Sequence, residues 1–187
     1  MDDQPTDVTA TLWSAVRALP DAGVMLIDGP SGAGKSTLAD QLLAQWPGSR
    51  RPTLVRLDDI YPGWAGLDAG ILHLNRFLLH PRSLGAEAAW QRFDWSKEAP
   101  GEWTTVEGTR PLIVEGCGAM AAANAPLAQV RVWIDADDRV RKQRALDRDG
   151  EVFRAHWDEW DSEWAEYVNR DRPARRATIR FSSTEKA

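Results

Sequence analysis

The sequence is poor in cysteine, in basic charge and in long apolar runs, and each shortage excludes a class of protein. Only one of its 187 residues is a cysteine, Cys117, so no internal disulfide can form and we expect a reducing compartment. Lys and Arg number 23 against 28 Asp and Glu, and a net charge of −5 argues against a general nucleic-acid binder. No stretch approaches the roughly 18 apolar residues that a membrane span needs, and the acidic, polar start Met1–Pro5 is unlike a signal peptide. We therefore expect a cytoplasmic protein that binds neither nucleic acid nor membrane.

Short apolar segments alternate with helical patterns along the chain, which is typical of an α/β fold with an open parallel sheet. The length suits a single domain spanning residues 1–187. The pattern predicts five strands, at 24–27, 53–57, 111–114, 130–134 and 177–181. It predicts helices at 8–19, 36–46, near 70–79, near 84–92, from 139 to 147 and at 151–169. Between about 60 and 105 the chain is less regular and rich in Gly, Pro and Trp.

The segment Gly29–Thr37 matches the phosphate-binding loop pattern G-x-x-x-x-G-K-[S/T]. It directly follows a predicted buried strand and directly precedes a predicted helix. Its glycines let backbone N–H groups point at one phosphate, and the helix adds its positive N-terminal end. Lys35 is expected to reach the β- and γ-phosphates, and Ser36 to ligate Mg²⁺. The predicted nucleotide-binding residues are Gly29, Ser31, Gly32, Ala33, Gly34, Lys35, Ser36 and Thr37.

Carboxylates follow two of the predicted strands, at the sheet edge where ligands bind in open α/β folds. Asp58 and Asp59 come at the end of the second strand, and either can take the proton from an attacking hydroxyl or hold the metal. Glu115 ends the third strand, as the carboxylate of a Walker B strand does, and is expected to act on Mg²⁺ or its water ligands. The predicted metal-binding residues are therefore Ser36, Glu115 and Asp58, and the choice between Asp58 and Asp59 as the base stays open.

Arginines follow the fourth strand at helical spacing. Arg141, Arg144 and Arg148 are separated by three and four residues, so they share one helix face. The planar guanidinium group of arginine can donate two parallel hydrogen bonds, which suits the negatively charged equatorial oxygens of a transferring phosphoryl group. We expect a short lid at about 141–152, in which Arg144 or Arg148 acts on that group. The alternative is a solvated helix face that pairs with neighbouring aspartates.

Ten tryptophans stand out beside two tyrosines and four phenylalanines. One aromatic group recurs at helical spacing and predicts an apolar stripe on helix 151–169 that packs on the core. The stripe comprises Phe153, Trp157, Trp160, Trp164 and Val168. Trp64 and Trp95 instead fall in the irregular region, where an aromatic ring can stack on a flat acceptor or line its pocket. We therefore place acceptor binding at about 60–105, and we expect Cys117 to be a small buried residue.

Several of these segments, taken in chain order, resemble the uridine kinase family of phosphate-loop kinases, which phosphorylate the ribose 5′-hydroxyl of uridine and cytidine with ATP. Besides the phosphate loop, the matching segments are Leu57-Asp58-Asp59-Ile60-Tyr61, Arg92-Phe93-Asp94-Trp95, Leu112-Ile113-Val114-Glu115-Gly116, and Ile134-Asp135-Ala136-Asp137 with the arginines that follow. The resemblance covers about residues 24–149. It departs from the family at 62–67, at 96–100 and at Phe93, where the family has a tyrosine, and in the family these segments bind the pyrimidine.

The resemblance implies a P-loop NTPase fold of the kinase type, with ATP and Mg²⁺ as cofactors and a nucleoside-like small molecule as the acceptor. It assigns the role of general base to Asp58 and the role of the metal-side glutamate to Glu115. It places Phe93 beside the nucleobase of the acceptor. The expected catalytic residues are Lys35, Asp58, Arg144 and Arg148. The expected substrate-binding residues are Asp59, Tyr61, Trp64, Phe93, Trp95 and Arg141.

Two other functions stay open at this point. The same fold could act on a nucleoside monophosphate, for which Arg76, Arg82 and Arg92 are available in the acceptor region, or on an antibiotic or another metabolite. The protein could also be a non-catalytic nucleotide-binding regulator that uses the Trp-rich helix as a partner surface. The oligomeric state is open as well, with a homodimer among the options.

Overall fold

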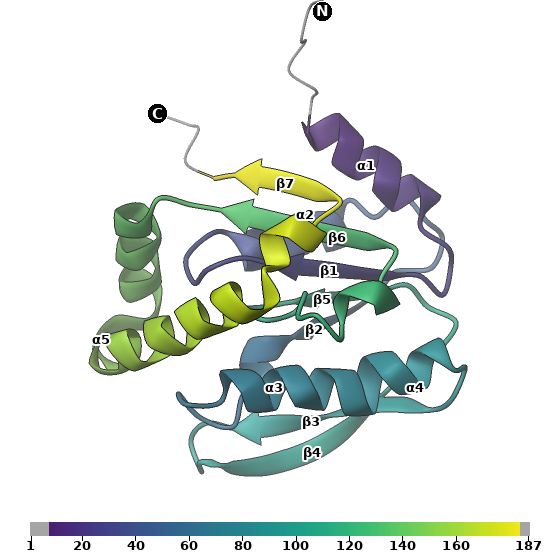
Figure 1. Ribbon diagram of the computed structural model, residues 1–187. Coiled ribbons are helices and arrows are strands. Elements are labelled where there is room, and N and C mark those ends of the chain that lie inside the picture. Colours follow the sequence, from purple (N-terminus) through teal and green to yellow (C-terminus); the bar gives the residue numbers. More distant parts are fainter. Residues whose placement is uncertain (1–7, 184–187) are drawn as a thin grey trace, which may run out of the picture.

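The structure, a computed structural model, describes residues 8–183, so the acidic segment Met1–Pro5 lies outside the described part. At its centre is a five-stranded parallel sheet in the order β2-β5-β1-β6-β7 (Figure 1). The strands are β1 (Val24–Asp28), β2 (Thr53–Arg56), β5 (Leu112–Glu115), β6 (Val130–Asp135) and β7 (Ile179–Ser182). Each overlaps a strand predicted from the sequence, so the predicted α/β fold with a parallel five-stranded sheet is confirmed.

Strand β1 lies in the middle of the sheet and sends alternate side chains into two apolar cores. Leu26 belongs to the core that contains the aromatic residues of α5 (Asp138–Asp171). Ile27 belongs to the other core, which is covered by α1 (Val8–Ala18) and α2 (Lys35–Ala44). Because both faces of β1 are buried, its sequence is a continuous apolar run.

The region from 60 to 105, expected to be irregular, is mostly a helix followed by a β-hairpin. The helix runs from α3 (Leu67–His73) through a π-helical stretch (Leu74–Leu79) to α4 (His80–Ser83), which confirms the helix predicted near 70–79. The helix predicted near 84–92 is wrong, because these residues lead into strand β3 (Ala88–Asp94), which pairs with β4 (Ala99–Val106).

The turn and the packing of this hairpin account for the difference. The Asp94 carboxylate accepts hydrogen bonds from the backbone N–H groups of Ser96 (3.0 Å) and Lys97 (3.2 Å), which fixes the turn. The backbone N–H of Gln91 donates to the ring of His73 (3.0 Å) and fastens β3 to the preceding helix. Cross-strand pairing and tertiary contacts therefore outweigh the helix propensity of the alanine-rich start of β3.

The helices predicted at 139–147 and 151–169 are consecutive limbs of α5, which bends at Gly150. Gly150 has a φ of 68° and a ψ of −151°, a backbone conformation that glycine adopts far more readily than other residues. Figure 1 shows the two limbs running in different directions. The second limb buries its predicted aromatic stripe in the core, comprising Phe153, Trp157, Trp160 and Trp164.

No helix within residues 8–183 combines the length and the apolar character that crossing a membrane would take.

Asp28, the last residue of β1, is a fully buried carboxylate that the sequence analysis does not single out. It accepts hydrogen bonds from the backbone N–H groups of Gly118 (3.1 Å) and Met120 (2.8 Å) and from the hydroxyl of Tyr167 (2.6 Å). Burial raises the pKa of Asp28, and the Tyr167 hydroxyl is the strongest of the contacts that lower it again. Asp28 thus ties the loop after β5 and the second limb of α5 to the strand that precedes the phosphate loop.

Replacing Tyr167 with Phe should lower the free energy of unfolding by about 2 kcal/mol, because a buried carboxylate loses a hydroxyl donor. For a chain of this length the midpoint of thermal unfolding should fall by about 4–8 °C. Tyr61→Phe is the matched control, since the hydroxyl of Tyr61 is equally buried but donates to the neutral carbonyl of Cys117 (2.6 Å). That control should lose about 1 kcal/mol. Equal losses in the two variants, measured by calorimetry, would contradict the role assigned to Asp28.

Candidate active site

The phosphate loop connects β1 to α2 and passes against the first limb of α5. A Cβ atom on Gly32 would lie 2.0 Å from the backbone oxygen of Arg141, and Gly32 has a φ of +79°, so only glycine fits this approach. Helix α2 begins at Lys35, and its N-terminal N–H groups face the loop. Of the predicted nucleotide-binding residues, all except Gly29 line one large pocket: Ser31, Gly32, Ala33, Gly34, Lys35, Ser36 and Thr37.

Lys35 is buried and its ammonium group spans the inside of the loop. It donates hydrogen bonds to the backbone oxygens of Gly29 and Pro30 (both 2.9 Å) and to Sγ of Cys117 (3.5 Å). Burial opposes the charge of Lys35, but Cys117 and the carboxylates of Glu115, Asp58 and Asp28 outweigh it, so the pKa of Lys35 is raised. Cys117 is buried, as predicted, and it also contacts the loop, which its sequence position does not indicate.

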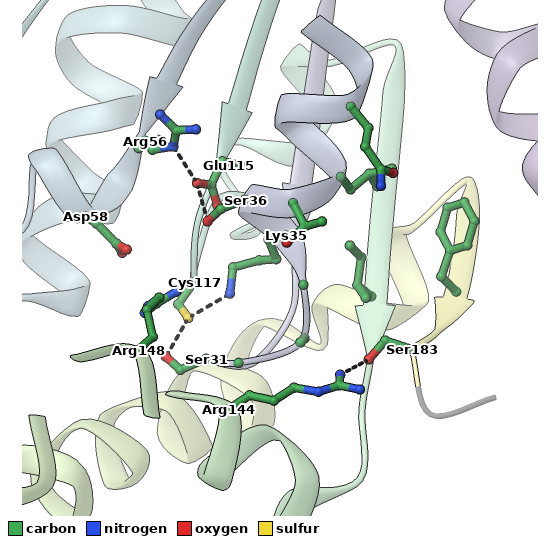
Figure 2. A pocket seen from close by; sticks show the side chains of 18 of the residues that line it. Ser31, Lys35, Ser36, Arg56, Asp58, Glu115, Cys117, Arg144, Arg148 and Ser183 are labelled. Atoms are coloured by element: carbon green, nitrogen blue, oxygen red, sulfur yellow. Dashed lines mark hydrogen bonds and ion pairs between the residues drawn. The ribbon is translucent and has the colours of Figure 1, made fainter. Parts of the chain in front are cut away.

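Ser36 and Glu115 meet on the sheet side of the loop (Figure 2). The Ser36 hydroxyl donates to Oε1 of Glu115 (2.9 Å), and Nε of Arg56 lies 3.3 Å from the same oxygen. Burial raises the pKa of Glu115, and the charge of Lys35 lowers it. A hydroxyl beside a carboxylate is a donor set that suits Mg²⁺.

Residues 8–183 contain no cluster of three His, Cys, Asp or Glu side chains that could hold a metal ion alone. Mg²⁺ usually keeps several waters and takes one or two carboxylates together with substrate phosphates. The pair of Ser36 and Glu115, with Asp58 across the pocket, therefore fits a cation that arrives with a nucleotide rather than one held by the protein alone.

Asp58 lies in the turn that follows β2, and Figure 2 shows its carboxylate on the pocket side of that turn. The structure gives this carboxylate no hydrogen bond or ion pair within residues 8–183. The residue is exposed to the pocket, yet the protein around it desolvates the carboxylate and raises its pKa, while the charges of Lys35 and Arg148 lower it. Asp59 points elsewhere: its carboxylate lies 3.4 Å from Nη2 of Arg92, and it does not line the pocket.

The first limb of α5 brings two of the three predicted arginines to the pocket. Arg148 lies on the side of Asp58, and Arg144 reaches under the loop to the hydroxyl of Ser183 (3.2 Å), as Figure 2 shows. Arg141, predicted near the acceptor, does not line the pocket. Its guanidinium is buried and pairs with Asp138 (2.7 Å) and with Asp161 of the second limb (2.9 Å).

The acceptor residues predicted from the sequence divide into two groups. Tyr61, Trp64 and Trp95 line the pocket. Asp59 and Phe93 do not, because Asp59 faces Arg92 and Phe93 packs edge-on against Trp95 with ring centroids 5.5 Å apart.

The aromatic stripe of α5 reaches the site, which its helical spacing predicts only as a core contact. Phe153 and Trp160 line the pocket, and the indole N–H of Trp160 donates to the hydroxyl of Ser31 in the phosphate loop (3.0 Å). The far end of the pocket is lined by residues of α1, α2 and β7 that no sequence motif marks. They include Thr9, Trp13, Gln41, Gln45 and Phe181.

The pocket has a volume of ≈ 1290 Å³ and runs from Asp58 over the phosphate loop to β7. Sites for one small molecule usually measure about 300–1,000 Å³, so this space suits a nucleotide together with a second ligand. A phosphate loop between a buried strand and a helix, on a sheet of this strand order, defines a P-loop fold of the kinase type.

Solved structures share this fold. A possible uridine kinase from Bacillus stearothermophilus is similar with a TM-score of 0.65 and 18% sequence identity, over 94% of this chain and 97% of that chain. A protein from Silicibacter sp. TM1040, named as a fructose transport system kinase, is similar with a TM-score of 0.54 and 16% identity, over 92% of this chain and 97% of that one. The chain thus has the fold of the uridine kinase-like P-loop kinases, as the motifs predict.

No protein-family model and no curated protein matches this chain.

Proposed function

We propose that this protein is an ATP-dependent kinase that transfers the γ-phosphoryl group to a hydroxyl of a small acceptor. A nucleoside of the uridine or cytidine type is the first candidate, because the motifs resemble that family and a structural neighbour bears the name of a possible uridine kinase. The observation that carries the proposal is the Asp58 carboxylate, which shares one pocket with Lys35 and for which the structure gives no partner among residues 8–183.

The residues divide the reaction between them. Asp58 accepts the proton of the acceptor hydroxyl, and the oxygen attacks the γ-phosphorus while the bond from that phosphorus to the bridging oxygen breaks and ADP leaves. Lys35 and the N–H groups of the loop hold the β- and γ-phosphates. Arg148, on the side of Asp58, stabilises the charge on the transferring group, and Arg144 holds the nucleotide from the other side.

Ser36 and Glu115 would hold Mg²⁺ directly or through its water ligands. When bound, the ion neutralises part of the phosphate charge. In the structure the two side chains already hydrogen-bond to each other, and Arg56 orients the carboxylate. Their mutual contact keeps both oxygens at the same edge of the phosphate loop.

Replacing Glu115 with Gln should raise the Mg²⁺ concentration needed for half-maximal activity by about 10-fold or more, the usual effect of removing a group that ligates or orients ligands of a metal. The measurement is a Mg²⁺ titration of ADP release at saturating ATP. Glu107→Gln is the control, because Glu107 pairs with Arg110 outside this pocket. An unchanged Mg²⁺ requirement in Glu115→Gln would remove this residue from the metal site.

The decisive experiment is a screen for ADP release from MgATP with nucleosides, nucleoside monophosphates and other hydroxylated metabolites as acceptors. Stimulation by uridine or cytidine supports the proposal. Stimulation by UMP or CMP alone would replace it with a monophosphate kinase. ATP binding without stimulation by any compound would favour a non-catalytic regulator.

The structure disfavours the monophosphate alternative. None of the three arginines that could bind an acceptor phosphate lines the pocket. Arg92 faces Asp59, Arg76 lies over the ring of Phe77, and Arg82 is buried with its guanidinium on backbone carbonyls.

A further inference from the structure

At the Asp58 end, the pocket has a wall of five aromatic rings. The wall consists of Tyr61, Trp64, Trp95, Phe153 and Trp160. The rings come from three separate parts of the chain: the segment after β2, the turn after β3 and the second limb of α5. They contact one another, with centroid distances of 5.0 Å from Trp64 to Trp95, 5.2 Å from Trp64 to Phe153 and 4.9 Å from Tyr61 to Trp160. The wall thus consists of two contacting groups, Trp64 with Trp95 and Phe153, and Tyr61 with Trp160, and of the five rings Trp64 and Trp95 are the more exposed ones.

Most polar atoms of this aromatic wall are already used within the protein. The indole N–H of Trp95 donates to the backbone oxygen of Asp58 (2.9 Å). The indole N–H of Trp160 donates to Ser31 (3.0 Å), and the hydroxyl of Tyr61 donates to the backbone oxygen of Cys117 (2.6 Å). These bonds hold the rings in place and use the N–H or O–H donors of three of the five rings.

The charged groups nearby are few. Arg148 donates hydrogen bonds from Nε and Nη2 to the two carboxylate oxygens of Asp149 (2.7 and 2.6 Å). Figure 2 places it beside the phosphate loop, where the proposed reaction puts the transferring group. Among the described side chains that line the pocket on this side, the Asp58 carboxylate and the indole N–H of Trp64 are the groups for which the structure gives no hydrogen-bond partner. A ligand ring that carries several hydrogen-bond donors and acceptors on its edge would therefore find few unpaired side-chain groups on this side of the pocket.

We infer that the aromatic wall seats the acceptor by the face of a flat ring and does not read the ring's edge. This inference rests on the proposed kinase function and names the acceptor class: alcohols that carry a flat ring, with one hydroxyl able to reach Asp58. Stacking on aromatic side chains tolerates different rings, because every flat ring presents a π-face. Trp95 is 37% exposed, so the wall opens to solvent and polar groups on the ring edge can stay hydrated there.

The test compares three ribofuranosides with the same 5-hydroxyl: uridine, the riboside that carries phenyl in place of uracil, and methyl ribofuranoside. The specificity constant kcat/KM is measured from ADP release with MgATP. The phenyl riboside should lie within about 10-fold of uridine, the scale on which apolar pockets discriminate. Methyl ribofuranoside, which has no flat ring, should be about 10- to 100-fold poorer than uridine, as expected from the loss of one stacked ring.

Two results would overturn the inference while leaving the kinase proposal intact. A site that reads the edge by hydrogen bonds rejects analogues without those groups by about 10⁴-fold or more, so a comparable loss with the phenyl riboside would count against it. Equal use of uridine and methyl ribofuranoside, or a preference for a sugar without a flat ring such as fructose, would show that no flat ring is seated. If no compound stimulates ADP release, the kinase proposal itself fails and the inference fails with it.

Two variants test whether the preference for a flat ring arises from the aromatic wall. Trp64→Leu should raise KM for uridine about 10-fold while KM for ATP stays unchanged, because one stacking surface is lost. Trp95→Leu gives a second reading if Trp64→Leu does not fold, since Trp64 also stacks on His156 (4.9 Å between centroids). Trp103→Leu is the control: Trp103 is exposed, packs on His73 and Phe77 away from the pocket, and its loss should change neither KM. A rise in KM for ATP instead of uridine would contradict the placement of the acceptor.

Discussion

Replacing Lys35 with Met should lower kcat/KM for phosphotransfer by about 10³-fold, the loss expected when a preorganised charge next to the transferring group is removed. The ammonium group lies inside the phosphate loop, and the backbone oxygens of Gly29 and Pro30 that accept its hydrogen bonds fix its position. Methionine has a similar length but offers no charge and no N–H donor. ADP release with saturating acceptor measures the effect, and circular dichroism shows whether the fold is kept.

Lys142→Met is the matched control for this variant. Lys142 lies on α5 outside the pocket, with a half-exposed side chain and its ammonium group over the ring of Trp157. Its replacement should leave kcat/KM within about 2-fold of the parent protein, as for most surface changes. Near-normal phosphotransfer by folded Lys35→Met would contradict the assignment of the phosphate loop as the catalytic site.

Replacing Asp58 with Asn should lower kcat by about 10²- to 10⁴-fold, the usual contribution of a general base. Asparagine keeps the size of the side chain but cannot accept the proton of the acceptor hydroxyl. Binding of ATP, measured by calorimetry, should change little, because the loop that holds the phosphates is untouched. Asp59→Asn is the neighbouring control, since Asp59 faces Arg92 outside the pocket and its replacement should leave kcat within about 2-fold of the parent value. Equal losses in both variants would contradict Asp58 as the base.

The pH profile gives a second check on Asp58. Desolvation raises its pKa above the ordinary value of 3.8, and only the deprotonated carboxylate accepts a proton. The rate should therefore rise with pH as Asp58 deprotonates and then level off, and this rise should be missing in Asp58→Asn. Because the charge of Lys35 lowers the pKa of Asp58, the residual activity of Lys35→Met should show the same rise at higher pH.

Much of the sheet could be predicted because buried parallel strands have a plain sequence signature. Strand β1 is covered on both faces and therefore reads as an unbroken apolar run before the phosphate loop. The hairpin of β3 and β4 lacks such a signature. Its strands are only partly buried, and their stability depends on the Asp94 turn and on contacts with the preceding helix, which the local sequence does not show.

The site could be predicted as far as single motifs reach. Lys35 and Ser36 belong to the phosphate-loop motif, and Glu115 belongs to the strand-end motif. Each motif is one short segment, so its place in the fold can be predicted from the local sequence. Arg141 could not be placed correctly, because Asp161 reaches it only after α5 has bent at Gly150. The contact of Trp160 with Ser31 joins residues 129 positions apart, and helical spacing cannot indicate which loop such a ring will meet.

The bend of α5 has a consequence for how the two substrates influence each other. One limb carries Arg144 and Arg148 beside the phosphate loop, and the other carries Phe153 and Trp160 of the aromatic wall. Gly150 lies between the two limbs. In the proposed kinase, a ligand that moved one limb relative to the other would change the site of the second ligand. The two binding equilibria are then thermodynamically linked, and the factor by which the acceptor changes the affinity for ATP equals the factor by which ATP changes the affinity for the acceptor. Measuring the affinity for ATP with and without the acceptor would give the size and the sign of this linkage.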